Sequence, residues 1–208
     1  SPYEFKVANN YGFAARIDNQ SVRNLRMSLS GYYGNSMHNS FPNDMRDTRY
    51  GDIKGTTAIG AFDFSYKSES LIIRGNADYG YVGDAVTINT VKRNLSSNSA
   101  PYKKPPVGQN AMAAGLEAGY DVLRLFSDGA SDKVFLFGRY DWYDSYIPAS
   151  GQQEYEYTSR HVATVGVNWL PIPQVAVKAE YTHRFLKSQF NNEPSVSIGI
   201  AYQGFFNR

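Results

Sequence analysis

The chain has 208 residues and a mass of 23.3 kDa, a length typical of one domain or two small ones. Its 21 basic and 19 acidic residues nearly cancel and form no Lys- or Arg-rich run, so we expect no nucleic-acid partner. No apolar run approaches the roughly 18 residues that a transmembrane helix needs. Because the chain has no cysteine, disulfides, thiol catalysis and cysteine metal sites are excluded.

The composition nevertheless differs from that of an ordinary soluble domain. Aromatic residues make up 15% of the chain and charged residues only 19%, yet the mean hydropathy is −0.47. Soluble domains carry roughly 25% charged residues. The apolar side chains must therefore be concentrated at particular positions along the chain.

Apolar and polar side chains alternate along the chain with a period of two, which is typical of β-strands. The first segment alternates from Phe5 to Ile17, where odd positions are mostly apolar, and the register survives across Asn9 and Asn10. It predicts one long strand. A second strand is expected at 25–33, with Leu25, Met27 and Leu29 on one face and Arg26 on the other.

The next two segments, 56–66 and 71–82, are joined by the tight connection 67–70 and predict a hairpin. Five further alternating segments follow at 111–123, 134–146, 157–170, 175–185 and 196–206. The sequence therefore predicts an all-β chain of about nine strands. All of 1–208 belongs to one domain in this interpretation.

The expected connections alternate between short and long. Short or moderate ones follow the first, third, fifth and seventh strands, at 19–20, 67–70, 124–133 and 171–173. Longer, polar ones lie at 34–55, 83–110, 147–156 and 186–194. Short turns on one rim and long extracellular loops on the other are the layout of a transmembrane antiparallel β-barrel.

The orientation of the two faces follows from charge and strand length. Charged residues such as Arg74, Glu117 and Arg139 stand in mid-strand on the polar face, and each would cost several kcal/mol in lipid. Strands of this length also reach the roughly 9–11 tilted residues that cross a bilayer. We therefore expect the apolar face to contact outer-membrane lipid and the polar face to line a watery lumen.

Strand parity predicts that the barrel is larger than these nine strands. The first strand is followed by a short turn, so it descends from the long-loop side, whereas such barrels begin on the short-turn side. At least one upward strand is therefore expected on the N-terminal side. In this interpretation the chain is the C-terminal part of a barrel whose N-terminal strands are missing.

Three segments carry a resemblance to a known family. TVGVNWLPIPQVAVKAEYTHR at 164–184, GRYDWYD at 138–144 and VSIGIAYQGFF at 196–206 resemble the C-terminal half of the phosphate-selective porin O/P family and its relatives in Bacteroidetes. The resemblance implies a bacterial outer-membrane barrel of about 16 strands, a homo-trimer, and a diffusion channel. The chain departs from the usual aromatic C-terminal residue, because Asn207 and Arg208 follow Phe206.

Charged residues of the polar face are the candidate solute-path residues. The basic candidates are Arg26, Arg74, Arg139, Lys178 and Arg184, and the acidic ones are Asp63, Asp78, Glu117, Asp121, Asp141 and Glu180. Two interpretations stay open. The arginines line a path for anions such as phosphate, or they pair with carboxylates, for example Arg74 with Asp78 or Arg139 with Asp141.

Two long loops are candidates for narrowing the pore. The 83–110 loop carries the adjacent cations Lys103 and Lys104 in a proline-rich stretch, and the 34–55 loop carries several charges of both signs. As constrictions they would contact anionic solutes. As ordinary exposed loops they need no role.

The sequence predicts no enzyme and no cofactor. No nucleophile elbow, P-loop, zincin motif or pair of catalytic carboxylates is present. His161 and His183 would lie opposite each other if the 171–173 turn is symmetric about Ile172, but no third ligand is visible, so we expect no metal site. The leading hypothesis is an outer-membrane channel for passive diffusion of small hydrophilic solutes. The alternatives are a surface adhesin or structural subunit, and a membrane-embedded hydrolase.

Overall fold

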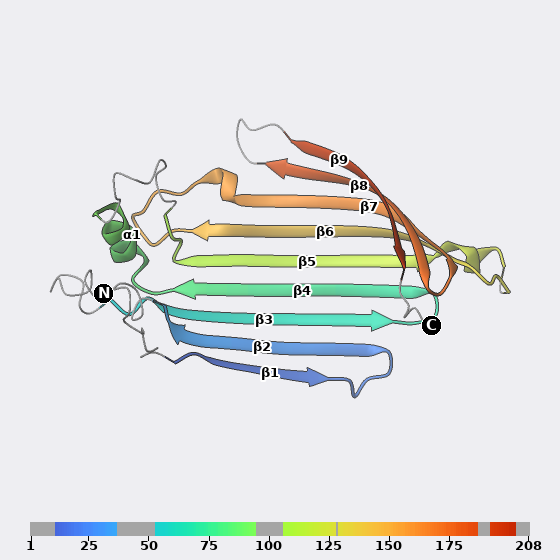
Figure 1. Cartoon of the computed structure of the whole chain (residues 1–208), viewed down its shortest axis with the longest axis horizontal. Helices are drawn as coiled ribbons and strands as arrows, with labels where there is room; N and C mark the ends of the chain where they lie inside the picture. Colours follow the sequence, from blue (N-terminus) through green and yellow to red (C-terminus); the bar gives the residue numbers. More distant parts are fainter. Residues whose placement is uncertain (1–10, 37–52, 95–105, 128, 187–191, 203–208) are drawn as a thin grey trace, which may run out of the picture.

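The computed structural model describes residues 11–36, 53–94, 106–127, 129–186 and 192–202. These residues form one antiparallel sheet in which nine strands follow each other in chain order, so every strand pairs with its sequence neighbours (Figure 1). The strands are β1 (Phe13–Asn19), β2 (Leu25–Asn35), β3 (Thr56–Lys67), β4 (Leu71–Val82), β5 (Asn110–Asp121), β6 (Lys133–Ile147), β7 (Ser159–Ile172), β8 (Val175–Leu186) and β9 (Glu193–Tyr202). The predicted all-β, antiparallel fold is confirmed.

Among the described residues three helical segments interrupt this pattern: α1 (Ala85–Asn94), η2 (Val122–Leu125) and η3 (Glu156–Thr158). None of the described helices is both long enough and apolar enough to cross a membrane. The expectation that the fifth strand reaches residue 123 is wrong. β5 ends at Asp121 because the Asp121 carboxylate accepts a hydrogen bond from the Leu123 N–H and caps η2.

Other strand bounds differ at the ends. β7 begins at Ser159 rather than 157 because η3 precedes it. β9 begins at Glu193 rather than 196 because Glu193 pairs with Arg184 and Pro194 with His183 of β8. The first half of the long initial strand, 5–10, lies outside the described residues, as does Phe206.

Consecutive strands run in opposite directions, so their connections alternate between the two ends of the sheet. In Figure 1 the connections after β1, β3, β5 and β7 lie at the right-hand end and those after β2, β4, β6 and β8 at the left-hand end. The left-hand end carries α1 within the connection expected as a loop at 83–110. That connection is therefore partly helical.

The strand register gives the sheet two continuous faces. One, the apolar face, carries Ile17, Leu29, Phe62, Ala77, Ala114, Trp142, His161 and Phe185 in a single row of paired residues. The charged face carries Asp18, Ser28, Asp63, Asn76, Gly115, Asp141, Val162, Arg184 and Glu193 in the neighbouring row. The two-residue period of each strand is thus kept in phase across all nine described strands.

Burial of the two faces is inverted relative to an ordinary globular protein. On interior strands the apolar-face residues Leu116, Leu136 and Val165 are 54%, 57% and 56% exposed. On the charged face Ser28 and Thr164 are buried, and so are Phe135 and Phe137, which the alternation of β6 places there. The charged face therefore covers small polar and aromatic side chains and leaves its arginines about half exposed, while the apolar face exposes side chains that a globular protein would bury.

A small apolar core sits at the long-connection end. Ile88 of α1 packs against Ile53, and both are at most 5% exposed, with Val82 and Val107 against them. Asp84 accepts backbone hydrogen bonds from Lys54 and Gly55 at 3.2 and 3.3 Å. The Asn89 side chain bonds both backbone groups of Val107, at 2.6 and 2.9 Å. These contacts fix α1 to the rim.

The outermost strands have one partner each. β1 pairs with β2 and β9 with β8, and every residue of β1 and β9 is exposed. Because both are odd-numbered strands of a meander, they run in the same direction. The sheet is open in the part of the chain that the structure describes.

Candidate functional site

Paired residues on β2 to β6 bring three of the predicted arginines into one row. Arg26 lies opposite Ser65, Ser65 opposite Arg74, Arg74 opposite Glu117, and Glu117 opposite Arg139. We call these five residues the basic row. Arginines stand on every second strand, and a polar or acidic residue separates them.

The adjacent row, two residues along each strand, is rich in hydrogen-bond acceptors. Its members on β2 to β6 are Ser28, Asp63, Asn76, Gly115 and Asp141, which we call the acceptor row. Residues two apart in a strand share a face and lie about 7 Å apart. The charged face thus sets a line of cations beside a line of acceptors.

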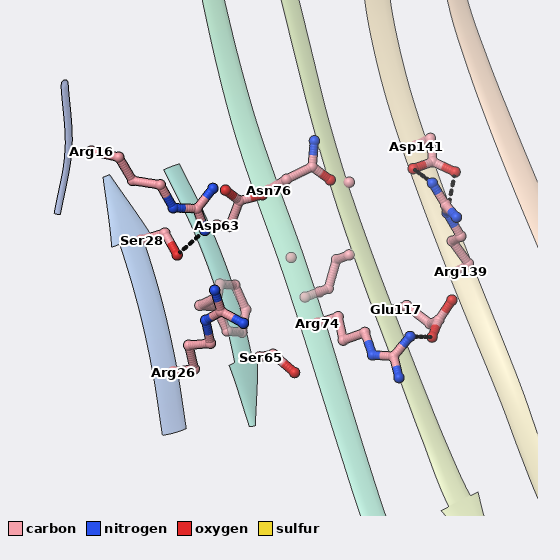
Figure 2. Close-up of a pocket in the computed structure, with 14 residues that line it drawn as sticks. Arg16, Arg26, Ser28, Asp63, Ser65, Arg74, Asn76, Glu117, Arg139 and Asp141 are labelled. Carbon is pink, nitrogen blue, oxygen red and sulfur yellow. Dashed lines mark hydrogen bonds and ion pairs between the residues drawn. The ribbon is translucent and has the colours of Figure 1, made fainter. Parts of the chain in front are cut away.

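The two rows line a pocket of about 440 Å³ on the charged face. Figure 2 shows Arg16, Arg26, Asp63 and Asn76 on one side of it, and Glu117, Arg139 and Asp141 on the other. The pocket is lined by Arg16, Arg26, Ser28, Asp63, Phe64, Ser65, Arg74, Gly75, Asn76, Gly115, Leu116, Glu117, Arg139 and Asp141. Four of these are cationic and three are anionic, so the lining is close to neutral.

The four arginines of the pocket form ion pairs whose N–O distances differ widely. Arg139 binds both carboxylate oxygens of Asp141, at 2.7 and 2.9 Å. Arg16 likewise binds Asp18 at 3.0 Å and donates to Ser28 at 2.8 Å. Arg26 is 3.4 Å from Asp18, and Arg74 is 3.9 Å from Glu117, beyond hydrogen-bond length. Arg26 and Arg74 are therefore the least constrained guanidinium groups in the pocket.

The predicted pairing of Arg139 with Asp141 is confirmed, and the pairing of Arg74 with Asp78 is wrong. Arg74 lies directly opposite Glu117 on β5, whereas Asp78 is four residues along the same strand. Directly opposed residues on neighbouring strands lie about 5 Å apart, much closer than residues four apart on one strand, so Arg74 pairs with Glu117. Asp78 instead accepts a hydrogen bond from the Asn76 amide at 2.7 Å.

Gly115 lets the acceptor row close up between β4 and β6. A Cβ at this position would lie 2.5 Å from an Asp141 oxygen and 2.8 Å from the Asn76 oxygen. Both oxygens lean over the glycine from neighbouring strands. Any larger residue would push them apart and out of the pocket.

The remaining basic candidates lie elsewhere. Lys178 pairs with Glu180 at 2.7 Å and sits 5.1 Å over the Phe137 ring, and Arg184 pairs with Glu193, all outside the pocket. Lys103 and Lys104, and most of the 34–55 loop, lie outside the described residues. The pocket therefore gathers Arg26, Arg74 and Arg139, while Lys178 and Arg184 lie apart from it.

Arg16 and Asp18 of β1 are functional candidates that the sequence reasoning missed. Both have even positions in the first alternating segment, so the parity rule that selected Arg26 also puts them on the polar face. Only the register shows what they contact, because it sets Asp18 opposite Ser28 and beside both Arg16 and Arg26.

Asp121 was expected among the solute-path residues, but its side chain is 1% exposed and lies at the base of the β5–β6 connection. Its carboxylate accepts hydrogen bonds from the Val134 N–H at 3.0 Å and the Leu123 N–H at 3.3 Å. In the same connection, hydrogen bonds from the Ser131 hydroxyl and the Trp169 indole lower the pKa of Asp132. Asp121 is therefore a structural group of this turn.

His161 and His183 do not face each other. His161 pairs with Phe185 and His183 with Ala163, because the β7–β8 register shifts between Trp169 and Ile172 and the turn is not centred on Ile172. Each imidazole instead bonds a tyrosine hydroxyl, Tyr140 at 2.7 Å and Tyr181 at 3.0 Å. Among the described residues no three His, Cys, Asp or Glu side chains form a metal-binding group.

Comparison with known proteins adds no assignment to this geometry. A scan against protein-family models and a search of curated proteins each gave no match to the chain. The site must therefore be interpreted from its own chemistry.

Proposed function

We propose that the chain is part of a bacterial outer-membrane β-barrel channel through which small hydrophilic solutes diffuse passively. The observation that carries the proposal is the inverted burial of the sheet. Among the described residues, leucine, valine and aromatic side chains on one face are exposed or half-buried with no second sheet packed over them, while ion pairs and a polar pocket occupy the other face. Lipid outside and water inside a barrel account for both.

Energetics favour this orientation over its reverse. An Arg or Lys on the lipid face of a barrel costs about 2–4 kcal/mol at the bilayer midplane. The apolar face has no Arg, Lys or Glu at its described strand positions between Leu25 and Tyr202. Its one Asp there, Asp144 near the end of β6, is 8% exposed and accepts hydrogen bonds from the Tyr146 N–H and the Thr158 hydroxyl. Contiguous exposed apolar surface of this extent is otherwise rare in soluble monomers.

The open sheet supports the further proposal that other strands complete the barrel. β1 and β9 run in the same direction, so direct pairing between them would be parallel. Antiparallel closure needs an odd number of added strands. About seven N-terminal strands, the difference between a barrel of about 16 and these nine, satisfy this condition.

The resemblance to phosphate-selective porins supports a trimer and a preference for anions. Ion pairing in the pocket limits that preference, since each of its four arginines lies within 4.0 Å of a carboxylate. The proposed solutes are therefore small hydrophilic molecules as a class, with anions among them.

Planar bilayers test the channel. The protein isolated from its native membrane should give discrete single-channel currents in KCl. A reversal potential measured across a salt gradient then gives ion preference. Absence of conductance from protein shown to be folded would reject the channel and favour the adhesin or structural role. A clear cation preference would reject the anion preference alone.

A further inference from the structure

Asp63 stands out among the charged groups of the pocket because, of the described residues, only Arg16 attracts it, and without a hydrogen bond or close ion pair. Its side chain is exposed, and among the described residues no hydrogen bond or ion pair of 4.0 Å or less reaches its carboxylate. Arg16 lies near it in Figure 2, but that guanidinium is held by Asp18 and Ser28. The pocket therefore presents one available carboxylate.

Arg26 and Arg74 are the complementary available cations. Their ion pairs are the longest in the pocket, and their side chains are 56% and 58% exposed. They stand on either side of Ser65 in the basic row, whose hydroxyl offers a further donor. Two guanidinium groups and a hydroxyl in this arrangement suit a carboxylate.

The two features lie at a defined spacing. Asp63 and Ser65 are two residues apart on β3 and share the charged face, so the acceptor row and the basic row are about 7 Å apart. Asn76, beside Asp63 on β4, adds an amide oxygen to the acceptor side. Two extended residues of polypeptide span at most about 7 Å.

We propose that this pocket binds short zwitterionic peptides of about two residues. Their ammonium group lies on Asp63 and the Asn76 oxygen, and their carboxylate lies between Arg26 and Arg74. The inference rests on the proposed function only for its physiological role, as the preferred solute of the channel. Binding itself requires only the sheet from β1 to β6.

The charge pattern favours a zwitterion over a simple anion or cation. An anion at Arg26 and Arg74 leaves the Asp63 carboxylate uncompensated nearby, and a cation at Asp63 leaves the two loosely held guanidinium groups without a ligand. A molecule with both charges at the matching distance satisfies both groups at once and needs none of the close ion pairs, such as Arg139 with Asp141, to open.

A binding titration of the full chain in detergent micelles tests the proposal, with NMR chemical shifts as the readout. The probes are glycylglycine, its N-acetylated form, which is only an anion, and its C-terminal amide, which is only a cation. Glycylglycine should bind best, and blocking either end should weaken binding roughly tenfold, the effect of one hydrogen-bonded charge.

Variants locate the two ends of the ligand. Asp63→Asn should make glycylglycine and its N-acetylated form bind equally. The double variant Arg26→Gln, Arg74→Gln should do the same for glycylglycine and its amide. Lys178→Gln and Glu180→Gln, the paired residues on β8 outside the pocket, are matched controls and should bind like the parent chain. Circular dichroism verifies that every variant is folded.

Three outcomes would overturn the proposal. These are binding of the N-acetylated probe as tightly as glycylglycine, no effect of Asp63→Asn, or no binding of any probe to the folded chain. The assay needs neither a closed barrel nor a membrane. Conductance without dipeptide binding would thus support the channel and reject only the dipeptide site. Dipeptide binding without conductance would support the site and reject the channel.

Discussion

Leu136 and Arg139, only three residues apart on β6, lie on opposite faces of the sheet. Leu136 is 57% exposed on the apolar face, and Arg139 binds Asp141 on the charged face. Hydropathy alone would rank Leu136 as a core residue and Arg139 as a surface one. In the structure both side chains are about half exposed, Leu136 on the apolar face and Arg139 on the charged face, so the pair gives a direct test of the proposed orientation.

Leu136→Arg should impair assembly into lipid vesicles, because a cation enters the hydrocarbon and costs about 2–4 kcal/mol. Arg139→Ala loses an ion pair whose arginine is about half exposed and should cost less than about 1 kcal/mol. The folded fraction in vesicles, measured by urea titration, checks both. Equal tolerance at the two positions would contradict a lipid-facing apolar face.

Asp121 has a structural role that the sequence alone did not distinguish from that of the other acidic residues on the charged face. Asp121→Ala should lower the free energy of unfolding by about 1–3 kcal/mol, because the Val134 and Leu123 N–H groups lose their buried acceptor. Asp132→Ala in the same connection is the control and should lower the free energy of unfolding less, because the hydrogen bonds of Asp132 with Ser131 and Trp169 are exposed to solvent. Urea midpoints measure both. Similar midpoints for the two variants would show that burial of Asp121 adds nothing.

At the scale of elements, strands were predictable and their irregularities were not. Period-two alternation places β2, β3, β4, β6 and β8 within two residues of their observed bounds at either end. It gave no sign of α1, whose Val86, Ile88 and Thr90 are poor helix formers. This helix depends on packing of Ile88 against Ile53 and on the Asn89 and Asp84 hydrogen bonds, all with distant residues.

Ile88→Asp should therefore release α1 from the rim, since it places a charge in the small apolar core. Val86→Asp, on the same helix but 41% exposed, is the matched control. Limited proteolysis should cleave within 85–94 much faster in the first variant than in the second. Equal cleavage rates would mean that this packing does not hold the helix.

At the scale of the whole molecule, the decisive feature is the pair of open edges. Exposed strand edges present unpaired N–H and C=O groups and are normally covered or paired. β1 and β9 are exposed along their whole length and point the same way. In the part of the chain that the structure describes, the sheet thus has two edges that cannot satisfy each other in antiparallel pairing.

Hydrogen exchange of this chain in micelles should reveal the edges. Amides of β1 and β9 that point away from the sheet should exchange several orders of magnitude faster than those of β5, which has a partner on both sides. Protection of β1 and β9 equal to that of β5 would show that they pair with each other or with a second copy. The proposal of an odd number of added strands would then be rejected.

Sequence alone determined the strand pattern, the two faces and the charged residues on one of them, because side-chain direction in a strand follows from position with a period of two. It could not determine which charges meet, since that depends on register between strands. Arg74 meets Glu117 rather than Asp78, and His161 misses His183, for this reason. The pocket, with Asp63 beside these arginines, likewise exists only once Arg26, Ser65 and Arg74 are aligned across three strands.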